Sequence, residues 1–211
     1  LIRVLKKQSN GTENTSPDAA EREKNCMNWK SLLSPRRVGQ QSEEQVAVRN
    51  AYQRDFDRIV FSPAFRRLQS KTQVFPLPET DFVHTRLTHS LESSCVGRSL
   101  GQMAGELLSS RNQLDDVEPW HLSSVVAAAN LAHDIGNPPF GHGGEEAMSY
   151  FFTSPLGRDI TREFTAAQRK DLENFEGNAM GFRLLTSTNP KKSSRSGGLG
   201  ITEATIGAFT K

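Results

Sequence analysis

Apolar side chains recur every three or four residues along most of the chain, a spacing typical of amphipathic helices. The clearest stretch predicts one long helix over residues 86–109, with an apolar face formed by Leu87, Leu91, Cys95, Leu100, Met103 and Leu107. A second helix is predicted to begin near Pro119 and to end by Gly136, because two prolines follow that glycine. Its apolar face is formed by Leu122, Val125, Val126, Ala129 and Ala132.

Shorter helices are predicted on either side of these two. One lies within residues 42–60, another begins at Ser62, and a third covers residues 145–152. The helix beginning at Ser62 is expected to carry on one face Phe65, Leu68 and Thr72. An ion pair is expected between the first two helices, and its candidates are Arg66 or Arg67 with Asp55 or Asp57. Since no alternating apolar and polar pattern of useful strand length is found, the predicted fold class is an all-α helical bundle.

The chain of 211 residues suits one domain, because domains commonly hold roughly 100–200 residues. Residues 1–43 are rich in Asn, Ser, Glu and Lys and show no sustained periodicity. Such composition is typical of segments that bury little apolar surface. We therefore predict a disordered or peripheral tail over residues 1–43 and a folded domain over residues 44–211.

Charge and cysteine content exclude several classes of protein. The chain has 26 Lys and Arg against 24 Asp and Glu, for a net charge of +2, so its overall charge does not indicate a nucleic-acid partner. No apolar run approaches the roughly 18–20 residues that span a bilayer. Cys26 and Cys95 stand in no spacing typical of a disulfide framework or a thiolate zinc site. We expect a cytoplasmic protein without a membrane partner.

The adjacent pair His133 and Asp134 lies where the second long helix is predicted to end. Adjacent helical side chains point about 100° apart, so both reach one ion most easily where the helix is ending. An imidazole and a carboxylate without a thiolate suit a divalent ion such as Mn, Fe, Co, Ni, Mg or Zn. Taken alone, the pair is equally compatible with a hydrogen bond at the end of a helix.

Two neighbouring segments strengthen the metal interpretation. Arg86 and His89 are three residues apart, so they share one face of the long helix. His142 and Glu145 have the same spacing, which lets the carboxylate orient the imidazole and raise its basicity. A purely structural role for every histidine would require three separate coincidences.

The order His89, His133, Asp134 resembles the HD superfamily of metal-dependent phosphohydrolases. Longer strings are similar to the bacterial deoxyguanosine triphosphate triphosphohydrolases over roughly residues 45–211. These strings are Phe65-Arg-Arg-Leu-Gln-Ser-Lys-Thr-Gln-Val-Phe, Arg86-Leu-Thr-His-Ser, His133-Asp-Ile-Gly-Asn-Pro-Pro-Phe-Gly-His-Gly-Gly-Glu and Phe175-Glu-Gly-Asn-Ala. The resemblance implies an HD-domain helical bundle, here truncated at its C-terminal side.

The resemblance implies that His89, His133 and Asp134 are ligands of one divalent metal ion. The resemblance implies that a further Asp completes this site, from a helix well after Phe175-Glu-Gly-Asn-Ala in a stretch that this chain is expected to lack. Asp159 and Asp171 fall too early in the chain to be that ligand. If the chain were the whole protein, its metal site would be incomplete.

The resemblance also assigns roles toward a nucleotide. Arg86 would bind phosphate, since a guanidinium can hold two phosphate oxygens at once. Gln73 would read the sugar 3′-hydroxyl, and His142, supported by Glu145, would move a proton near the leaving oxygen. Asn178 would either face the pocket or brace two helices.

The predicted reaction is hydrolysis of a deoxynucleoside triphosphate, with dGTP favoured, to a deoxynucleoside and inorganic triphosphate. A divalent ion would neutralise phosphate charge and lower the pKa of the attacking water. Two alternatives stay open: an HD phosphohydrolase acting on another nucleotide, and a non-catalytic nucleotide-binding subunit that lacks the fourth ligand. Family members form symmetric oligomers, so homo-oligomerisation is also expected.

Overall fold

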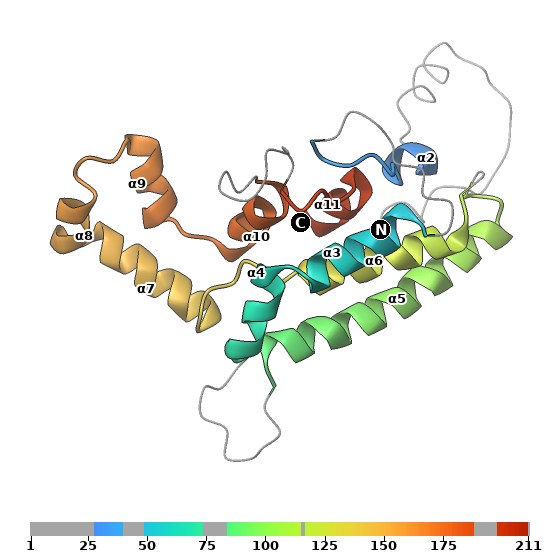
Figure 1. Ribbon diagram of the computed structural model, residues 1–211, viewed down its shortest axis with the longest axis horizontal. Helices are drawn as coiled ribbons and strands as arrows, with labels where there is room; N and C mark the ends of the chain where they lie inside the picture. Colours follow the sequence, from blue (N-terminus) through green and yellow to red (C-terminus); the bar gives the residue numbers. More distant parts are fainter. Residues whose placement is uncertain (1–27, 40–48, 74–83, 115–116, 188–197, 211) are drawn as a thin grey trace, which may run out of the picture.

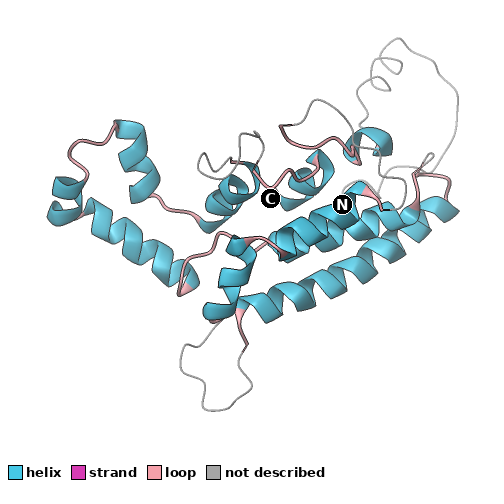
Figure 2. Ribbon diagram, viewed as in Figure 1, coloured by secondary structure: helices cyan, strands magenta, loops and turns pink. Residues whose placement is uncertain are grey.

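The computed structural model describes residues 28–39, 49–73, 84–114, 117–187 and 198–210, and helices dominate these residues (Figures 1 and 2). In chain order they are α2 (Trp29–Leu32), α3 (Ala51–Val60), α4 (Pro63–Arg66), the 3₁₀ helix η2 (Arg67–Ser70), α5 (Arg86–Ser110), α6 (Pro119–Ala132), α7 (Gly141–Thr153), α8 (Pro155–Ile160), α9 (Ala166–Glu173), α10 (Gly177–Thr186) and α11 (Glu203–Phe209). Extended pairing among the described residues consists of two isolated bridges, Arg37 with Thr202 and Thr72 with Thr85. The predicted all-α class is confirmed.

Helix boundaries follow local capping signals. The side chain of Asn50 accepts from the backbone N–H of Gln53 and begins α3, and Thr85 forms a capping box with Thr88 at the start of α5. Pro119 occupies the first turn of α6, where its missing N–H costs no hydrogen bond. Both long helices therefore have nearly the predicted bounds.

The segment after Ser62 differs from its prediction. Instead of one helix reaching Thr72, the chain forms the short helices α4 and η2 and then becomes extended at Lys71. The Lys71 carbonyl accepts from the N–H of Arg86, and Thr72 bridges to Thr85. The end of η2 is thus held beside the start of α5, a tertiary contact that helical periodicity does not encode.

The core lies between α3, α6, α10 and α11, with α5 lying along the other side of α6 (Figure 1). Its most deeply buried apolar side chains are Ile59, Leu68, Leu131, Ile135, Leu185 and Ile201. Helices α7, α8 and α9 extend away from this bundle, and α10 returns to it (Figure 1). Within the described residues, no helix is both long and apolar enough to cross a membrane.

The predicted apolar face of α5 is wrong. The residues of α5 that are buried are Arg86, Ser90, Ser94, Gly97, Gly101 and Gly105, whereas Leu100 and Met103 are 59% and 65% exposed. Small residues let the backbones of α5 and α6 approach closely, and the Ser94 hydroxyl donates to the Ala127 carbonyl across the gap. The helix is therefore packed mainly through its small side chains, with Leu87 and Leu108 packed against the core at its two ends. The exposed apolar side chains are Leu91, Val96, Leu100, Met103 and Leu107.

We expect Gly101→Ala to lower the free energy of unfolding by about 1–3 kcal/mol, because the added methyl overpacks the α5–α6 contact. A Cβ on Gly101 would lie 2.9 Å from Cα of Ser123, which is backbone and cannot rotate away. Urea denaturation measures the change. Gly207→Ala in α11 is the matched control, since its Cβ would meet open space and should leave stability unchanged or slightly higher. Equal effects of the two changes would contradict the close packing of α5 on α6.

Residues 28–39 pack against the bundle, although a peripheral or disordered tail was predicted for residues 1–43. Leu33 lies in an apolar cluster with Tyr52, and Arg37 is only 6% exposed. Contacts to α3 and α11 hold these twelve residues on the outside of the bundle. The rest of the predicted tail lies outside the described residues, and a domain boundary at residue 44 stays a prediction.

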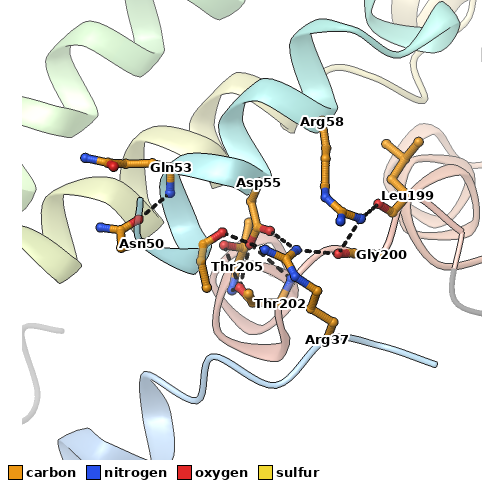
Figure 3. A network of polar contacts seen from close by, with 10 residues as sticks. Arg37, Asn50, Gln53, Asp55, Arg58, Leu199, Gly200, Thr202 and Thr205 are labelled. Carbon is orange, nitrogen blue, oxygen red and sulfur yellow. Dashed lines mark hydrogen bonds and ion pairs between the residues drawn. The ribbon is translucent and has the colours of Figure 1, made fainter. Parts of the chain in front are cut away.

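A buried ion pair secures this segment (Figure 3). Arg37 donates to Oδ1 of Asp55 at 2.6 Å and to the carbonyl of Ala51 at 3.0 Å. Asp55 accepts through Oδ2 from the backbone N–H and the hydroxyl of Thr202. The expected pairing of Asp55 or Asp57 with Arg66 or Arg67 is therefore wrong, since the partners are Arg37 for Asp55 and Arg49 for Asp57.

Candidate metal centre

Three ligand candidates meet where the start of α5 lies beside the end of α6. Helices α5 and α6 lie side by side and run in opposite directions (Figure 1). His89 of α5 therefore lies close to His133 and Asp134, which directly follow α6. One ligand atom from each lies within 4.8 Å of the other two, and the two imidazole ring centroids are 5.1 Å apart. We call these three residues the metal group.

The surroundings of His89 and His133 leave each imidazole able to donate a lone pair to a metal ion. Nδ1 of His133 is 2.7 Å from the carbonyl of Asn130, which can only accept, so Nδ1 carries the proton. The lone pair of Nε2, which lies 3.4 Å from Oδ1 of Asp134, is then available to an ion shared with that carboxylate. Burial lowers the pKa of His89, and the neighbouring His133 lowers it further. His89 is therefore neutral at neutral pH, which is the form that binds a metal.

Asp134 is held from two sides. Its Oδ2 accepts from Nη1 of Arg86 at 2.7 Å, and its Oδ1 accepts from the side-chain amide of Asn137 at 2.6 Å. Arg86 and Asp134 are each 7% exposed. Fixed outer partners of this kind orient a metal-binding carboxylate and raise the affinity of the site.

The residues present fit a divalent ion. Two imidazoles and one oriented carboxylate are a ligand set of borderline divalent metals. A second group, His84 and Glu92 with His89, also brings its ligand atoms within 4.8 Å of one another. The side chains of His84 and Glu92 are 44% and 60% exposed, so this group lacks the buried outer partners that Asp134 has.

His142 and Glu145 pair at the start of α7. Nδ1 of His142 is 2.8 Å from Oε2 of Glu145, and Oε1 of Glu145 accepts from the backbone N–H of Gly177 at 2.8 Å. The Glu145 side chain is 16% exposed, whereas that of His142 is 96% exposed. The dyad therefore has a fixed carboxylate and an imidazole open to solvent.

Gly141 joins this dyad to the metal group. It has φ +55°, and a Cβ on it would lie 2.6 Å from Nη2 of Arg86. Only glycine adopts this backbone conformation without strain and leaves room for the guanidinium. Helix α7 thus begins directly against Arg86, the residue that also holds Asp134.

The comparison with known proteins identifies the family. The HD domain family model matches residues 86–180, the stretch that contains the metal group and the dyad. Deoxyguanosinetriphosphate triphosphohydrolase-like proteins of Synechocystis sp. and Pseudomonas aeruginosa are each 48% identical over 88% of this chain. The chain thus carries an HD domain and matches part of the deoxyguanosinetriphosphate triphosphohydrolase-like proteins. The resemblance found in the sequence is therefore confirmed.

A further relative, the deoxyguanosinetriphosphate triphosphohydrolase of Klebsiella pneumoniae, is 41% identical over 77% of the chain. The chain spans 42% of the length of the Synechocystis relative, 41% of the Pseudomonas relative and 37% of the Klebsiella one. The match therefore concerns the HD domain and its immediate surroundings.

Gln73 lies beside the segment that leads into α5. Its backbone N–H donates to the carbonyl of His84 at 3.0 Å, next to the bridge between Thr72 and Thr85. Its side-chain Oε1 is buried and has no hydrogen-bond partner among the described residues. Among the described residues, a buried hydrogen-bond acceptor is thus left unpaired near the start of α5.

Two other predicted site residues already have partners within the chain. Asn178 is exposed, and its side-chain amide donates to Oε1 of Glu176 at 2.7 Å at the start of α10. Arg86 is engaged with Asp134, and its Nε has no partner among the described residues. Their predicted contacts with a nucleotide stay predictions.

Sequence reasoning missed Lys71 and Asn137. Nζ of Lys71 donates to the carbonyl of Asn137 at 2.6 Å, and burial followed by the charge of Arg86 lowers the pKa of Lys71. Both residues stand inside the strings that carry the family resemblance, which was the available signal.

A cavity of about 450 Å³ lies away from the metal group, between α3, α5 and α6. None of the predicted site residues lines it. Its lining residues are Arg49, Gln53, Phe56, Asp57, Arg98, Trp120, Ser123, Ser124 and Ala127.

Proposed function

We propose that the protein hydrolyses a deoxynucleoside triphosphate, with dGTP as the favoured substrate, to the deoxynucleoside and inorganic triphosphate. The observation that carries the proposal is the joining of the metal group to the His142–Glu145 dyad, with Arg86 between them under Gly141. The names of the relatives support the substrate class.

In this proposal His89, His133 and Asp134 hold one divalent ion, of Mn, Mg, Fe, Co, Ni or Zn. The ion, when bound, supplies charge neutralisation at phosphate and a lower pKa for the attacking water. Arg86 adds positive charge beside the phosphates while it keeps Asp134 in place.

The His142–Glu145 dyad donates a proton to the leaving group. Glu145 accepts from Nδ1–H of His142 and stabilises the doubly protonated imidazolium, whose Nε2–H gives its proton to the nucleoside oxygen as the bond to phosphorus breaks, which leaves a neutral imidazole protonated on Nδ1. Because Glu145 is itself fixed by the N–H of Gly177, the imidazole is held in one orientation.

Gln73 and Asn178 would contact the nucleoside. The open Oε1 of Gln73 suits a hydroxyl donor such as the sugar 3′-hydroxyl. Asn178 would turn from Glu176 toward the substrate. Homo-oligomeric assembly and a cytoplasmic location are part of the same proposal.

Incubation of the purified protein with dGTP and Mn²⁺ or Mg²⁺ tests the reaction. Phosphorus NMR should show inorganic triphosphate without dGMP or orthophosphate, and chromatography should show deoxyguanosine. His142→Ala should slow the reaction by roughly a hundredfold, the scale of losing a general acid, while metal content stays the same.

Glu146→Ala is the control for Glu145→Ala, because Glu146 is the next carboxylate along α7 and is exposed. It should keep the wild-type rate, whereas Glu145→Ala should lose most of it. Release of pyrophosphate or orthophosphate would assign the protein to another HD activity. Absence of turnover by metal-loaded protein would favour a nucleotide-binding subunit.

A further inference from the structure

Asn137 forms hydrogen bonds both with Asp134 of the metal group and with Lys71, which follows η2. Its side-chain amide donates to Oδ1 of Asp134 at 2.6 Å, its backbone N–H donates to the Asp134 carbonyl at 3.1 Å, and its own carbonyl accepts from Lys71. These contacts fix the backbone and the side chain of Asn137 together. The orientation of the Asp134 carboxylate therefore depends on where Asn137 sits.

Helix α10 begins directly on Asn137. A Cβ on Gly177, the first residue of α10, would overlap Oδ1 of Asn137 and would lie 2.8 Å from Oε1 of Glu145. The N–H of Gly177 is also the donor that fixes Glu145. One glycine thus touches both the residue that orients Asp134 and the residue that orients His142.

The turn that contains Gly136 is also packed tightly against α10. A Cβ on Gly136 would overlap the carbonyl of Gly177 and the N–H of Gly181, so the backbone of α10 lies directly on the turn that follows α6. Interiors packed this closely transmit a displacement instead of absorbing it. A shift of Gly177 must therefore move Asn137, Glu145 or both.

We propose that Asn137 is a positioning residue which, through its contact with Gly177, couples the orientation of the metal ligand Asp134 to that of the His142–Glu145 dyad. The side-chain NH₂ of Asn137 orients the carboxylate of Asp134. Its side-chain Oδ1 limits how closely Gly177, the first residue of α10, can approach. This inference rests on the proposed metal site, and it adds a mechanical link between two sets of residues that share no direct hydrogen bond.

Metal affinity tests the link without measuring catalysis. Asn137→Ala removes a hydrogen bond from Asp134, and loss of such an outer partner typically weakens metal binding by roughly 10- to 100-fold. Gly177→Ala should weaken binding by a similar factor although Gly177 contacts no ligand, because its methyl displaces the Asn137 amide. Titration with Co²⁺, followed by its visible absorption, measures both affinity and ligand geometry.

A double-mutant cycle separates coupling from general destabilisation. In the variant that carries Asn137→Ala and Gly177→Ala, the methyl no longer has an amide to displace, so Co²⁺ affinity should equal that of Asn137→Ala alone. Independent effects would multiply instead, because changes at uncoupled sites add in free energy. A multiplied loss of affinity in the double variant would overturn the proposal.

Gly143→Ala is the matched control, since it makes the same change in the first turn of α7 and its Cβ would meet nothing within 4 Å. It should leave Co²⁺ affinity unchanged, and urea denaturation should show every variant folded under the titration conditions. Unchanged affinity in Asn137→Ala and in Gly177→Ala would overturn this inference alone. Failure of the wild-type protein to bind Co²⁺ would overturn the proposed metal site together with it.

Discussion

Replacement of Arg37 by alanine is expected to lower the free energy of unfolding by about 3–5 kcal/mol, because it leaves the charge of Asp55 buried and unpaired. Asp55 is fully buried, and after the change its remaining described partners are the N–H and hydroxyl of Thr202. The loss should appear in urea denaturation followed by circular dichroism, as a lower midpoint.

The adjacent arginine provides the control. Arg36 forms an ion pair with Glu203, but its side chain is 66% exposed, and exposed pairs contribute at most about 1 kcal/mol. Arg36→Ala should therefore change stability little. The double change Arg37→Met with Asp55→Leu should recover much of the loss, since neither charge is then buried. Equal stability of Arg36→Ala and Arg37→Ala would contradict the buried role of this pair.

Asp134→Ala is expected to abolish detectable binding of Mn²⁺ and to lower the free energy of unfolding by about 3 kcal/mol or more, since it also leaves Arg86 buried without its carboxylate. The two effects have separate causes, namely loss of a ligand and loss of an ion-pair partner. Isothermal titration with Mn²⁺ and urea denaturation measure them in the same preparation.

His89→Ala separates these causes. It removes a ligand of the metal group but leaves the ion pair of Arg86 with Asp134 intact, so Mn²⁺ binding should be lost with a smaller change in stability. If Asp134→Ala kept wild-type Mn²⁺ affinity, Asp134 would not be a ligand. If it lost no more stability than His89→Ala, the pairing with Arg86 would not be contributing to the fold.

The sequence by itself determined where the long helices run, because helix formation depends on neighbours three and four residues apart. The capping residues Asn50 and Thr85 and the helix-starting Pro119 are local signals of the same kind, and α5 and α6 have nearly their predicted bounds. The metal group could also be predicted, since the order of its residues and the string after His133 carry the family resemblance.

The orientation of α5 was not determined by its own pattern. Periodicity finds an apolar face, but it cannot say whether a partner helix packs on that face or on the small residues beside it. Close backbone approach favours Gly97, Gly101 and Gly105, since a Cβ at any of them would meet atoms of α6 within about 3 Å. Which face of α5 is buried depends on the shape of α6, and the periodicity of the α5 sequence carries no information about that helix.

Only the tertiary structure decided the partners of the buried charges. Arg37 is 18 residues from Asp55, and Arg86 is 48 residues from Asp134. A charge pair has no sequence periodicity, so the nearer arginines Arg66 and Arg67 were expected for Asp55. The family resemblance implied a phosphate contact for Arg86 and did not indicate its pairing with Asp134. The cost of burying a charge selects whichever opposite charge the packed helices bring within hydrogen-bond distance, and that is settled only when the chain has folded.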